Sequence, residues 1–173
     1  MNLKEATEFI LFENKSSLPQ LWLDLGCGTG LFTLALAGNL PVGSKIIAID
    51  KDERALSKIP ATVNDVMIQT VAADFVNGAF NIKEVDGILT ANSLHYVKDK
   101  ETLLKKLIPS MKTDGFFLIV EYDRRAGNQW VPYPLTIDAA KEVFKSVGYS
   151  SFHELNKRPS AFGRYFMYAA IIR

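Results

Sequence analysis

The composition of the chain is that of a single globular domain, with 173 residues, 48% hydrophobic and 23% charged. Twenty Lys and Arg residues against nineteen Asp and Glu leave a net charge of +1, so we expect no nucleic-acid partner drawn by a global field. The single cysteine, Cys27, excludes an internal disulfide and a metal centre built on several thiolates. Because charges interrupt the N-terminus and no apolar run could span a membrane, we expect a cytoplasmic protein.

The predicted elements alternate between apolar runs and helical patterns, after an N-terminal segment (1–19) expected to form a helical cap. This segment either covers a ligand cleft or packs on the sheet. Continuous apolar runs, typical of strands buried on both faces, occupy Leu21–Leu25, Lys45–Asp50, Val66–Val71, Val85–Thr90 and Phe116–Glu121. Helical patterns occupy Gly30–Leu40, Asp52–Ile59, Asp99–Met111 and Thr136–Val147. The alternation predicts one doubly wound α/β domain over residues 1–173.

The C-terminal part breaks this alternation. Two strand-like runs, Ser150–Leu155 and Phe162–Ile172, have no helix between them. A short turn over Lys157–Ser160 is expected to join them, which requires an antiparallel hairpin.

The first apolar run ends in alternating glycines, Gly26, Gly28 and Gly30, with Asp24 two residues before the first. Such glycines permit a sharp strand-to-helix turn and let a ligand lie on the main chain. A dinucleotide fingerprint would need glycine where Leu31 stands, which disfavours a nicotinamide-dependent oxidoreductase. The pattern D-x-G-x-G-x-G resembles motif I of the class I S-adenosylmethionine (SAM)-dependent methyltransferases. That resemblance implies a Rossmann-like, mostly parallel seven-stranded sheet with an antiparallel C-terminal hairpin strand.

Two further acids follow the second and third strands. Asp50 is placed to accept the ribose hydroxyls of a nucleoside, or else to cap the next helix. Asp74, in Ala-Asp-Phe, corresponds to the family's adenine acceptor, or else it caps its own loop. After the fourth strand, Asn92 stands where the family holds the methionine amine. The resemblance therefore implies a SAM site formed by Asp24, Gly26, Cys27, Gly28, Gly30, Asp50, Lys51, Asp74, Phe75 and Asn92.

The segment Leu94–Val97 resembles the Leu-His-His-Val of small-molecule methyltransferases, including those of quinone biosynthesis. His95 is the candidate general base, since histidine titrates near neutral pH; the alternative is a histidine that only shapes its loop. The aromatic-rich connection Tyr122–Leu135 is expected to roof the acceptor site. Four arginines are candidate anchors for an anionic acceptor: Arg124, Arg125, Arg158 and Arg164.

The predicted function is methyl transfer from SAM to a small molecule. The alternative is a SAM-binding protein without catalysis, such as an activating subunit, because the chain has almost no inserted substrate domain. The sequence does not identify the acceptor.

Overall fold

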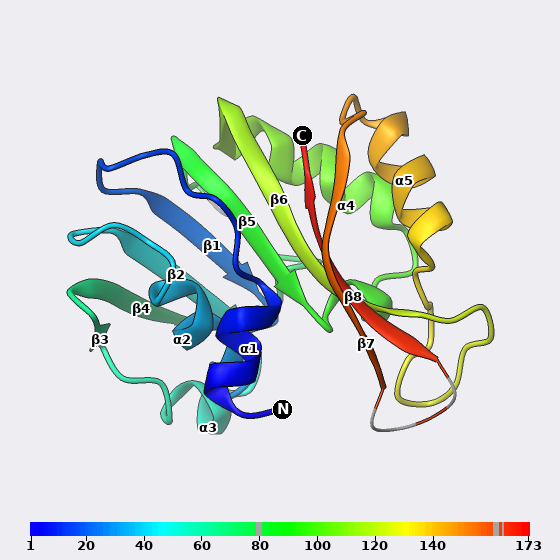
Figure 1. Cartoon of the computed structure of the whole chain (residues 1–173), viewed down its shortest axis with the longest axis horizontal. Helices are drawn as coiled ribbons and strands as arrows, with labels where there is room; N and C mark the ends of the chain where they lie inside the picture. Colours follow the sequence, from blue (N-terminus) through cyan, green and yellow to red (C-terminus); the bar gives the residue numbers. More distant parts are fainter. Residues whose placement is uncertain (79–80, 161–162, 164) are drawn as a thin grey trace.

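A computed structural model of the chain describes residues 1–78, 81–160, 163 and 165–173. Within them one eight-stranded sheet runs in the order β3-β4-β2-β1-β5-β6-β8-β7 (Figure 1). The strands are β1 (Leu21–Leu25), β2 (Lys45–Asp50), β3 (Thr62–Val63), β4 (Val66–Ala72), β5 (Val85–Ala91), β6 (Met111–Asp123), β7 (Phe152–Pro159) and β8 (Phe166–Ile172). The α-helices are α1 (Leu3–Phe9), α2 (Leu31–Ala37), α3 (Glu53–Leu56), α4 (Lys100–Leu107) and α5 (Ile137–Ser146). Two short 3₁₀ helices, η1 (Leu94–Tyr96) and η2 (Ile108–Ser110), flank α4.

The sheet confirms the predicted topology. Strands β4, β2, β1, β5 and β6 pair in parallel, whereas β8 is antiparallel to both β6 and β7. After β4 the chain crosses to the other side of β1 and forms β5, so the direction of winding reverses beside β1. In doubly wound sheets, ligands bind at the carboxyl ends of the strands next to this reversal.

The sheet has one strand more than predicted, because Thr62 and Val63 form β3. Asn64 and Asp65, at φ 49° and 58°, make a tight turn that pairs Val63 with Val66. Asn and Asp adopt positive φ more readily than most residues, so they suit a two-residue hairpin. The Asn-Asp pair was the sequence signal for this strand.

Several boundaries differ from the predicted ones. Strand β6 begins at Met111 instead of Phe116, because Met111 pairs with Val85 ahead of a register shift. Helix α3 spans only Glu53–Leu56, and α4 stops at Leu107, just before the 3₁₀ turn that contains Pro109. The predicted turn at Lys157–Ser160 is wrong, because β7 continues to Pro159 and pairs that residue with Phe166. Proline is tolerated there since β7 is an edge strand. The predicted strand start at Phe162 lies outside the described residues.

Helices cover both faces of the sheet, with α1 and α2 on one side and α4 and α5 on the other (Figure 1). The N-terminal segment packs on the sheet: Phe12 contacts the rings of Trp22 and Phe116 at 5.8 and 5.6 Å between centroids. Trp22 is fully buried over Gly87, where a Cβ atom would lie 2.5 Å from the indole. The helical part of this segment is limited to α1, and no described residue of 1–19 lines the clefts described below.

Candidate active site

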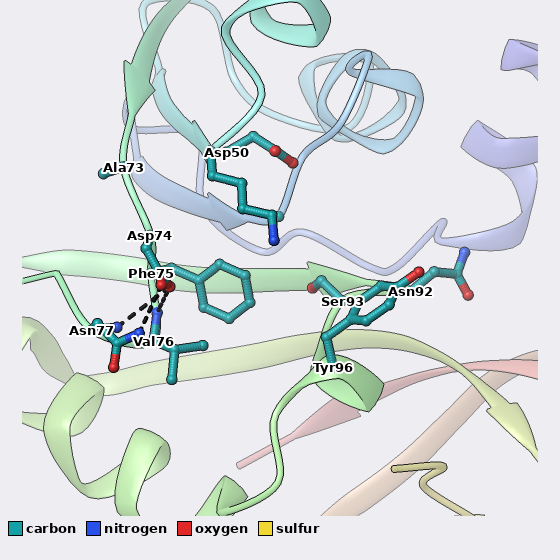
Figure 2. A pocket seen from close by; sticks show the side chains of 11 residues that line it. Asp50, Ala73, Asp74, Phe75, Val76, Asn77, Asn92, Ser93 and Tyr96 are labelled. Atoms are coloured by element: carbon teal, nitrogen blue, oxygen red, sulfur yellow. Dashed lines mark hydrogen bonds between the residues drawn. The ribbon is translucent and has the colours of Figure 1, made fainter. Parts of the chain in front are cut away.

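A cleft of about 600 Å³, here called the first cleft, opens at the carboxyl ends of β2, β4 and β5 (Figure 2). Figure 2 shows Asp74 and Phe75 on the left, Asn92, Ser93 and Tyr96 on the right, and Asp50 above them. The cleft is lined by Gly26, Asp50, Lys51, Ala73, Asp74, Phe75, Val76, Asn77, Asn92, Ser93 and Tyr96. Its size is that of a typical small-ligand site.

The glycine turn adopts a backbone that residues with a Cβ rarely take. Gly26, Gly28 and Gly30 have φ of 75°, 54° and 86°. A Cβ at Gly26 would lie 2.6 Å from Ser93 Cβ, because the Ser93 hydroxyl donates to Leu25 O at 2.6 Å and closes β1 against the end of β5. A Cβ at Gly28 would meet nothing within 4 Å, so the turn is open on that side.

The Asp50 carboxylate braces this turn from β2. Its Oδ2 accepts from Gly28 N at 2.8 Å and its Oδ1 from Asp52 N at 3.0 Å. Asp52, and not Asp50, caps α3, since its side chain accepts from Arg54 N and Ala55 N. Each Asp50 oxygen has a second lone pair free for another donor, because a carboxylate offers about four acceptor sites.

Asp74 caps its own loop and also lines the first cleft. It accepts from Val76 N at 2.9 Å and from Asn77 Nδ2 at 2.7 Å. The Asn77 hydrogen bond, followed by the one from Val76, lowers the pKa of Asp74. Both sequence interpretations of Asp74 are therefore compatible with its geometry.

Asp24 lies beneath the turn instead of in the cleft. It is 1% exposed, and Thr33 Oγ1 donates to its Oδ2 at 2.6 Å. Among the described residues nothing donates to its Oδ1. Burial raises the pKa of Asp24 to about 7; Thr33 opposes the change and the nearby charge of Asp50 adds to it. Three other predicted cofactor residues also lie outside the described lining of the first cleft: Cys27, Gly28 and Gly30.

Asn92 follows β5 in a left-handed conformation, with φ 54°. Its N–H donates to Val120 O at 2.8 Å, which fixes the chain where it leaves the sheet. No donor in the described part of the chain reaches its buried Oδ1. A residue at positive φ with an unpaired buried acceptor, placed in a cleft, is a candidate for ligand binding.

A second cleft, of about 430 Å³, shares Asn92 and Tyr96 with the first. Its walls come from η1, the end of β6, the connection after β6 and the residues before β8. The lining residues are Asn92, His95, Tyr96, Tyr122, Asn128, Trp130, Val131 and Tyr165. Tyr96 and Trp130 are 56% and 69% exposed, so this cleft presents aromatic surface to solvent.

His95 and Glu121 form a buried pair beside the second cleft. The imidazole Nδ1 lies 2.7 Å from Glu121 Oε2, and His95 N donates to Glu121 Oε1 at 3.1 Å. The two residues are 2% and 0% exposed. A carboxylate on Nδ1 favours the tautomer in which Nδ1 carries the proton and Nε2 a lone pair. Sequence reasoning missed this role of Glu121, although an acid at the end of the apolar run Phe116–Val120 was a visible signal.

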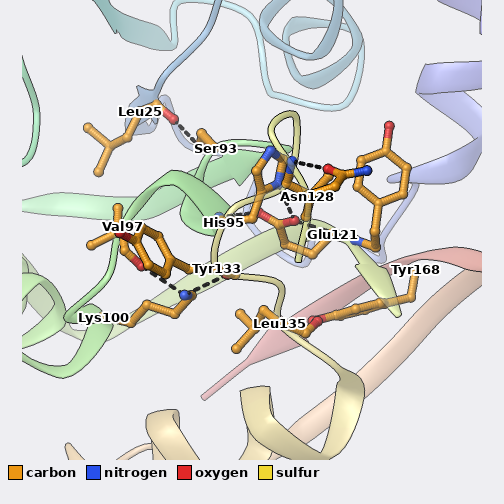
Figure 3. A network of polar contacts seen from close by, with 12 residues as sticks. Leu25, Ser93, His95, Val97, Lys100, Glu121, Asn128, Tyr133, Leu135 and Tyr168 are labelled. Atoms are coloured by element: carbon orange, nitrogen blue, oxygen red, sulfur yellow. Dashed lines mark hydrogen bonds and ion pairs between the residues drawn. The ribbon is translucent and has the colours of Figure 1, made fainter. Parts of the chain in front are cut away.

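Hydrogen bonds from buried Lys100 hold the connection after β6 against the end of η1 (Figure 3). Its ammonium donates to Val97 O at 2.8 Å and to Tyr133 O at 2.9 Å, and Tyr133 N donates to His95 O at 2.9 Å. Burial lowers the pKa of Lys100, against the attraction of Glu121. The predicted roof segment therefore lies against η1 and supplies Asn128, Trp130 and Val131 to the second cleft.

The candidate arginines do not line either cleft among the described residues. Arg124 stacks on the ring of Tyr165 at 4.7 Å, and Arg158 pairs with Glu5 at 3.7 Å. Arg164 lies outside the described residues. An anionic acceptor stays a prediction, with Arg124 as the arginine next to a cleft wall.

Comparison with known proteins identifies the family. A family model described as a methyltransferase domain matches residues 23–115, from within β1 to the first part of β6, a range that includes the glycine turn, Asp50, Asp74 and His95. The chain belongs to this methyltransferase domain family. The quinone-biosynthesis branch is not singled out by the comparisons.

Curated relatives are distant. The carboxy-S-adenosyl-L-methionine synthase of Nautilia profundicola is 27% identical over 143 residues, covering 79% of this chain and 58% of that protein. The cypemycin N-terminal methyltransferase of a Streptomyces species is 27% identical over 125 residues, covering 67% and 50%. The chain thus spans about half the length of the curated relatives it matches.

Solved structures share the fold across almost the whole chain. The plantazolicin methyltransferase BpumL, solved with SAH, superposes with a TM-score of 0.67 at 16% identity, covering 99% of this chain and 81% of that one. A SAM-dependent methyltransferase from Aquifex aeolicus gives 0.66 at 18% identity, covering 99% and 87%. These superpositions establish the Rossmann-like methyltransferase fold. Within the described residues, no helix is both long and apolar enough to span a bilayer.

Proposed function

We propose that the protein is a SAM-dependent methyltransferase whose acceptor is a small molecule. The observation that carries this proposal is the junction of two clefts at Asn92 and Tyr96. Asp50, Asp74 and Gly26 of the glycine turn line one cleft, as expected of a nucleoside site. A histidine and several aromatic side chains line the other. A donor in the first cleft and an acceptor in the second would meet at this junction.

The residues that line the first cleft fit SAM, the methyl donor. Asp50 retains acceptor capacity for the ribose hydroxyls, and Asp74 and Phe75 line the cleft where an adenine needs an acceptor and an apolar contact. The unpaired Oδ1 of Asn92 is an acceptor for the methionine ammonium group. When bound, SAM supplies a methyl group activated by the sulfonium charge. The names of the carboxy-S-adenosyl-L-methionine synthase relative and of the SAH complex are consistent with this ligand.

The protein's own contribution would be alignment and proton removal. Holding two reactants in line is worth up to roughly 7–11 kcal/mol of the barrier. His95, whose Nδ1 is held by Glu121, is placed to remove a proton from the methyl acceptor in the second cleft. This role for His95 adds to the alignment and applies only to acceptors that carry a proton at neutral pH.

Calorimetric titrations with SAM, with S-adenosylhomocysteine (SAH, the demethylated product) and with NADH, beside a transfer assay with labelled SAM and a metabolite mixture, test the proposal. We expect SAM and SAH to bind, NADH not to bind, and label to reach an organic acceptor. Binding of SAH without transfer or hydrolysis would favour the alternative of a non-catalytic or activating subunit. Binding of NADH without SAH would overturn the SAM site itself.

A further inference from the structure

We propose that the acceptor is a planar aromatic compound with an ionisable hydroxyl group, bound in the second cleft with that hydroxyl at His95. This inference rests on the proposed function and narrows it to one substrate class. It follows from the shape of the walls, from their charge and from the His95–Glu121 pair.

The walls of the second cleft are aromatic on several sides. Tyr122 and Tyr165 meet edge to face, with centroids 5.7 Å apart and planes at 87°. Tyr96 lies against His95 at 4.4 Å between centroids, and Trp130 comes from the roof segment. Aromatic rings prefer offset-stacked and edge-to-face contacts with other rings, so this lining favours a planar aromatic guest over a saturated one.

The charge of the lining disfavours a charged acceptor. Its polar members other than the tyrosines are Asn92, Asn128 and His95, and among the described residues it includes no Arg, Lys, Asp or Glu. Asn128 is already used within the roof, because its Oδ1 accepts from Trp130 N at 3.0 Å and Val131 N at 2.7 Å. An anion or a cation entering this cleft would lose water without gaining a full opposite charge from the lining. Arg124 stacks on the ring of Tyr165 and is not part of the lining, so this inference replaces the anionic acceptor expected from the sequence with a neutral one.

The buried His95–Glu121 pair indicates which proton-bearing group the acceptor carries. Glu121 receives two N–H groups from His95 and a longer contact from Tyr122 N at 3.4 Å, so it is arranged as an acceptor. With its proton on Nδ1, His95 offers the lone pair of Nε2. An aromatic hydroxyl is the group that such a base assists most directly, because its oxygen becomes a strong nucleophile on losing the proton.

The reaction then balances as follows. The hydroxyl proton moves to Nε2 of His95, the oxygen forms a bond to the methyl carbon, and the carbon–sulfur bonding pair stays on the sulfur. The products are an aryl methyl ether, SAH and a protonated His95 that returns its proton to solvent. Glu121 does not touch the acceptor in this scheme; it is a positioning residue that orients the imidazole.

Calorimetry on protein saturated with SAH tests the assignment with a matched series of bicyclic probes. We expect 2-naphthol to bind at least tenfold more tightly than decahydro-2-naphthol, 2-naphthoate and (2-naphthylmethyl)ammonium. Absence of 2-naphthol binding, or tighter binding of the anion, the cation or the saturated alcohol, would overturn the proposal. Failure of SAH to bind in the preceding titration would instead refute the proposed function.

Three variants test whether the probe binds in the second cleft. Trp130→Leu should weaken 2-naphthol at least fivefold, whereas Trp130→Phe, which keeps a ring, should weaken it less than twofold. Glu121→Gln should weaken 2-naphthol at least fivefold and leave 2-methoxynaphthalene, which has no proton to give, within twofold of the wild-type value. Equal effects of the two Trp130 variants, or equal losses for naphthol and its ether in Glu121→Gln, would contradict the assignment.

Discussion

The two clefts meet at Asn92 and Tyr96, yet they are built in different ways. The first is made by main-chain turns and acids at the ends of adjacent parallel strands, each within a short contiguous motif. The second combines η1, the end of β6, a long connection and the residues before β8, and its central pair joins His95 to Glu121 across 26 positions. A site for the methyl donor can be formed by local motifs, whereas the second cleft depends on segments that are far apart in the sequence.

If the first cleft binds SAM and the second holds the acceptor and the base, variants in the second cleft should lower methyl transfer without changing the affinity for SAH. His95→Gln is expected to lower methyl transfer by about 10²–10⁴-fold, the usual contribution of a general base. Its affinity for SAH should stay within about twofold, because His95 is not part of the described lining of the first cleft. Transfer rates and calorimetry measure the two effects.

The matched control for this variant is His153→Gln, which changes the exposed histidine of β7. That variant should behave as the wild type in both measurements. A large loss of SAH affinity in His95→Gln, with methyl transfer reduced only in proportion to that loss, would show that the two clefts do not have separate roles.

Asp24, buried beneath the glycine turn, should make the stability of the protein depend on pH. Its native pKa of about 7 lies above the ordinary value of 3.8, so between these values the native state binds more protons than the unfolded chain. The free energy of unfolding should therefore fall as pH rises through this interval, by an amount on the order of 4 kcal/mol at about 1.4 kcal/mol per pH unit. Asp24→Asn keeps an acceptor for Thr33 but cannot ionise, and it should lack this loss.

Denaturant unfolding at pH 4 and pH 8, without ligand, measures that difference. We expect Asp24→Asn to gain stability relative to the wild type at the higher pH. The same pH slope for both proteins would show that Asp24 is not the buried acid responsible.

Two glycines of the same turn distinguish folding from binding. Gly26→Ala should lose roughly 2–4 kcal/mol of stability, because it adds a contact with Ser93 Cβ to the strain of a positive φ. Gly28→Ala should lose about 1–2 kcal/mol from strain alone, since its Cβ would point into open space. Midpoints of denaturant unfolding compare them. Equal losses would mean that crowding by Ser93 has no part in the conformation of the turn.

The last pair of variants concerns Asp50. Asp50→Asn should weaken SAH by about 1.5–3 kcal/mol, or roughly ten- to a hundredfold, through loss of charge at the ribose hydroxyls. The control is Asp52→Asn, two residues on, which caps α3 and lies outside the described lining of the first cleft. Calorimetry on both variants, with melting temperatures alongside, checks the difference. Similar affinities for the two would remove Asp50 from the donor site.

The sequence predicted the first cleft better than the second for a physical reason. Parallel strands bring their carboxyl ends to one edge, so Asp50, Asp74 and Asn92 could be placed together once the strands were recognised. The positive φ of Gly26, Gly28 and Gly30 followed from their alternation. That Asp24 lies beneath the turn instead of in the cleft depends on the packing of Thr33 from α2, which spacing does not reveal.

The partners of His95 could not be derived in the same way. Glu121 ends an apolar run and reads as the last residue of a strand; its role depends on β5 and β6 being neighbours, with Ala91 opposite Val120. The buried ammonium of Lys100 looks from sequence like a solvated charge in the first turn of a helix. The hairpin turn was placed too early because a proline normally ends a strand, whereas β7 is an edge strand that tolerates Pro159.

A crystal structure of the protein with SAH tests the division between the clefts most directly. We expect the ribose at Asp50, the adenine between Asp74 and Phe75, the amino group at Asn92, and the sulfur facing the second cleft next to Tyr96. Density for SAH in the second cleft against His95 and Trp130, or away from Asp50, would contradict this division.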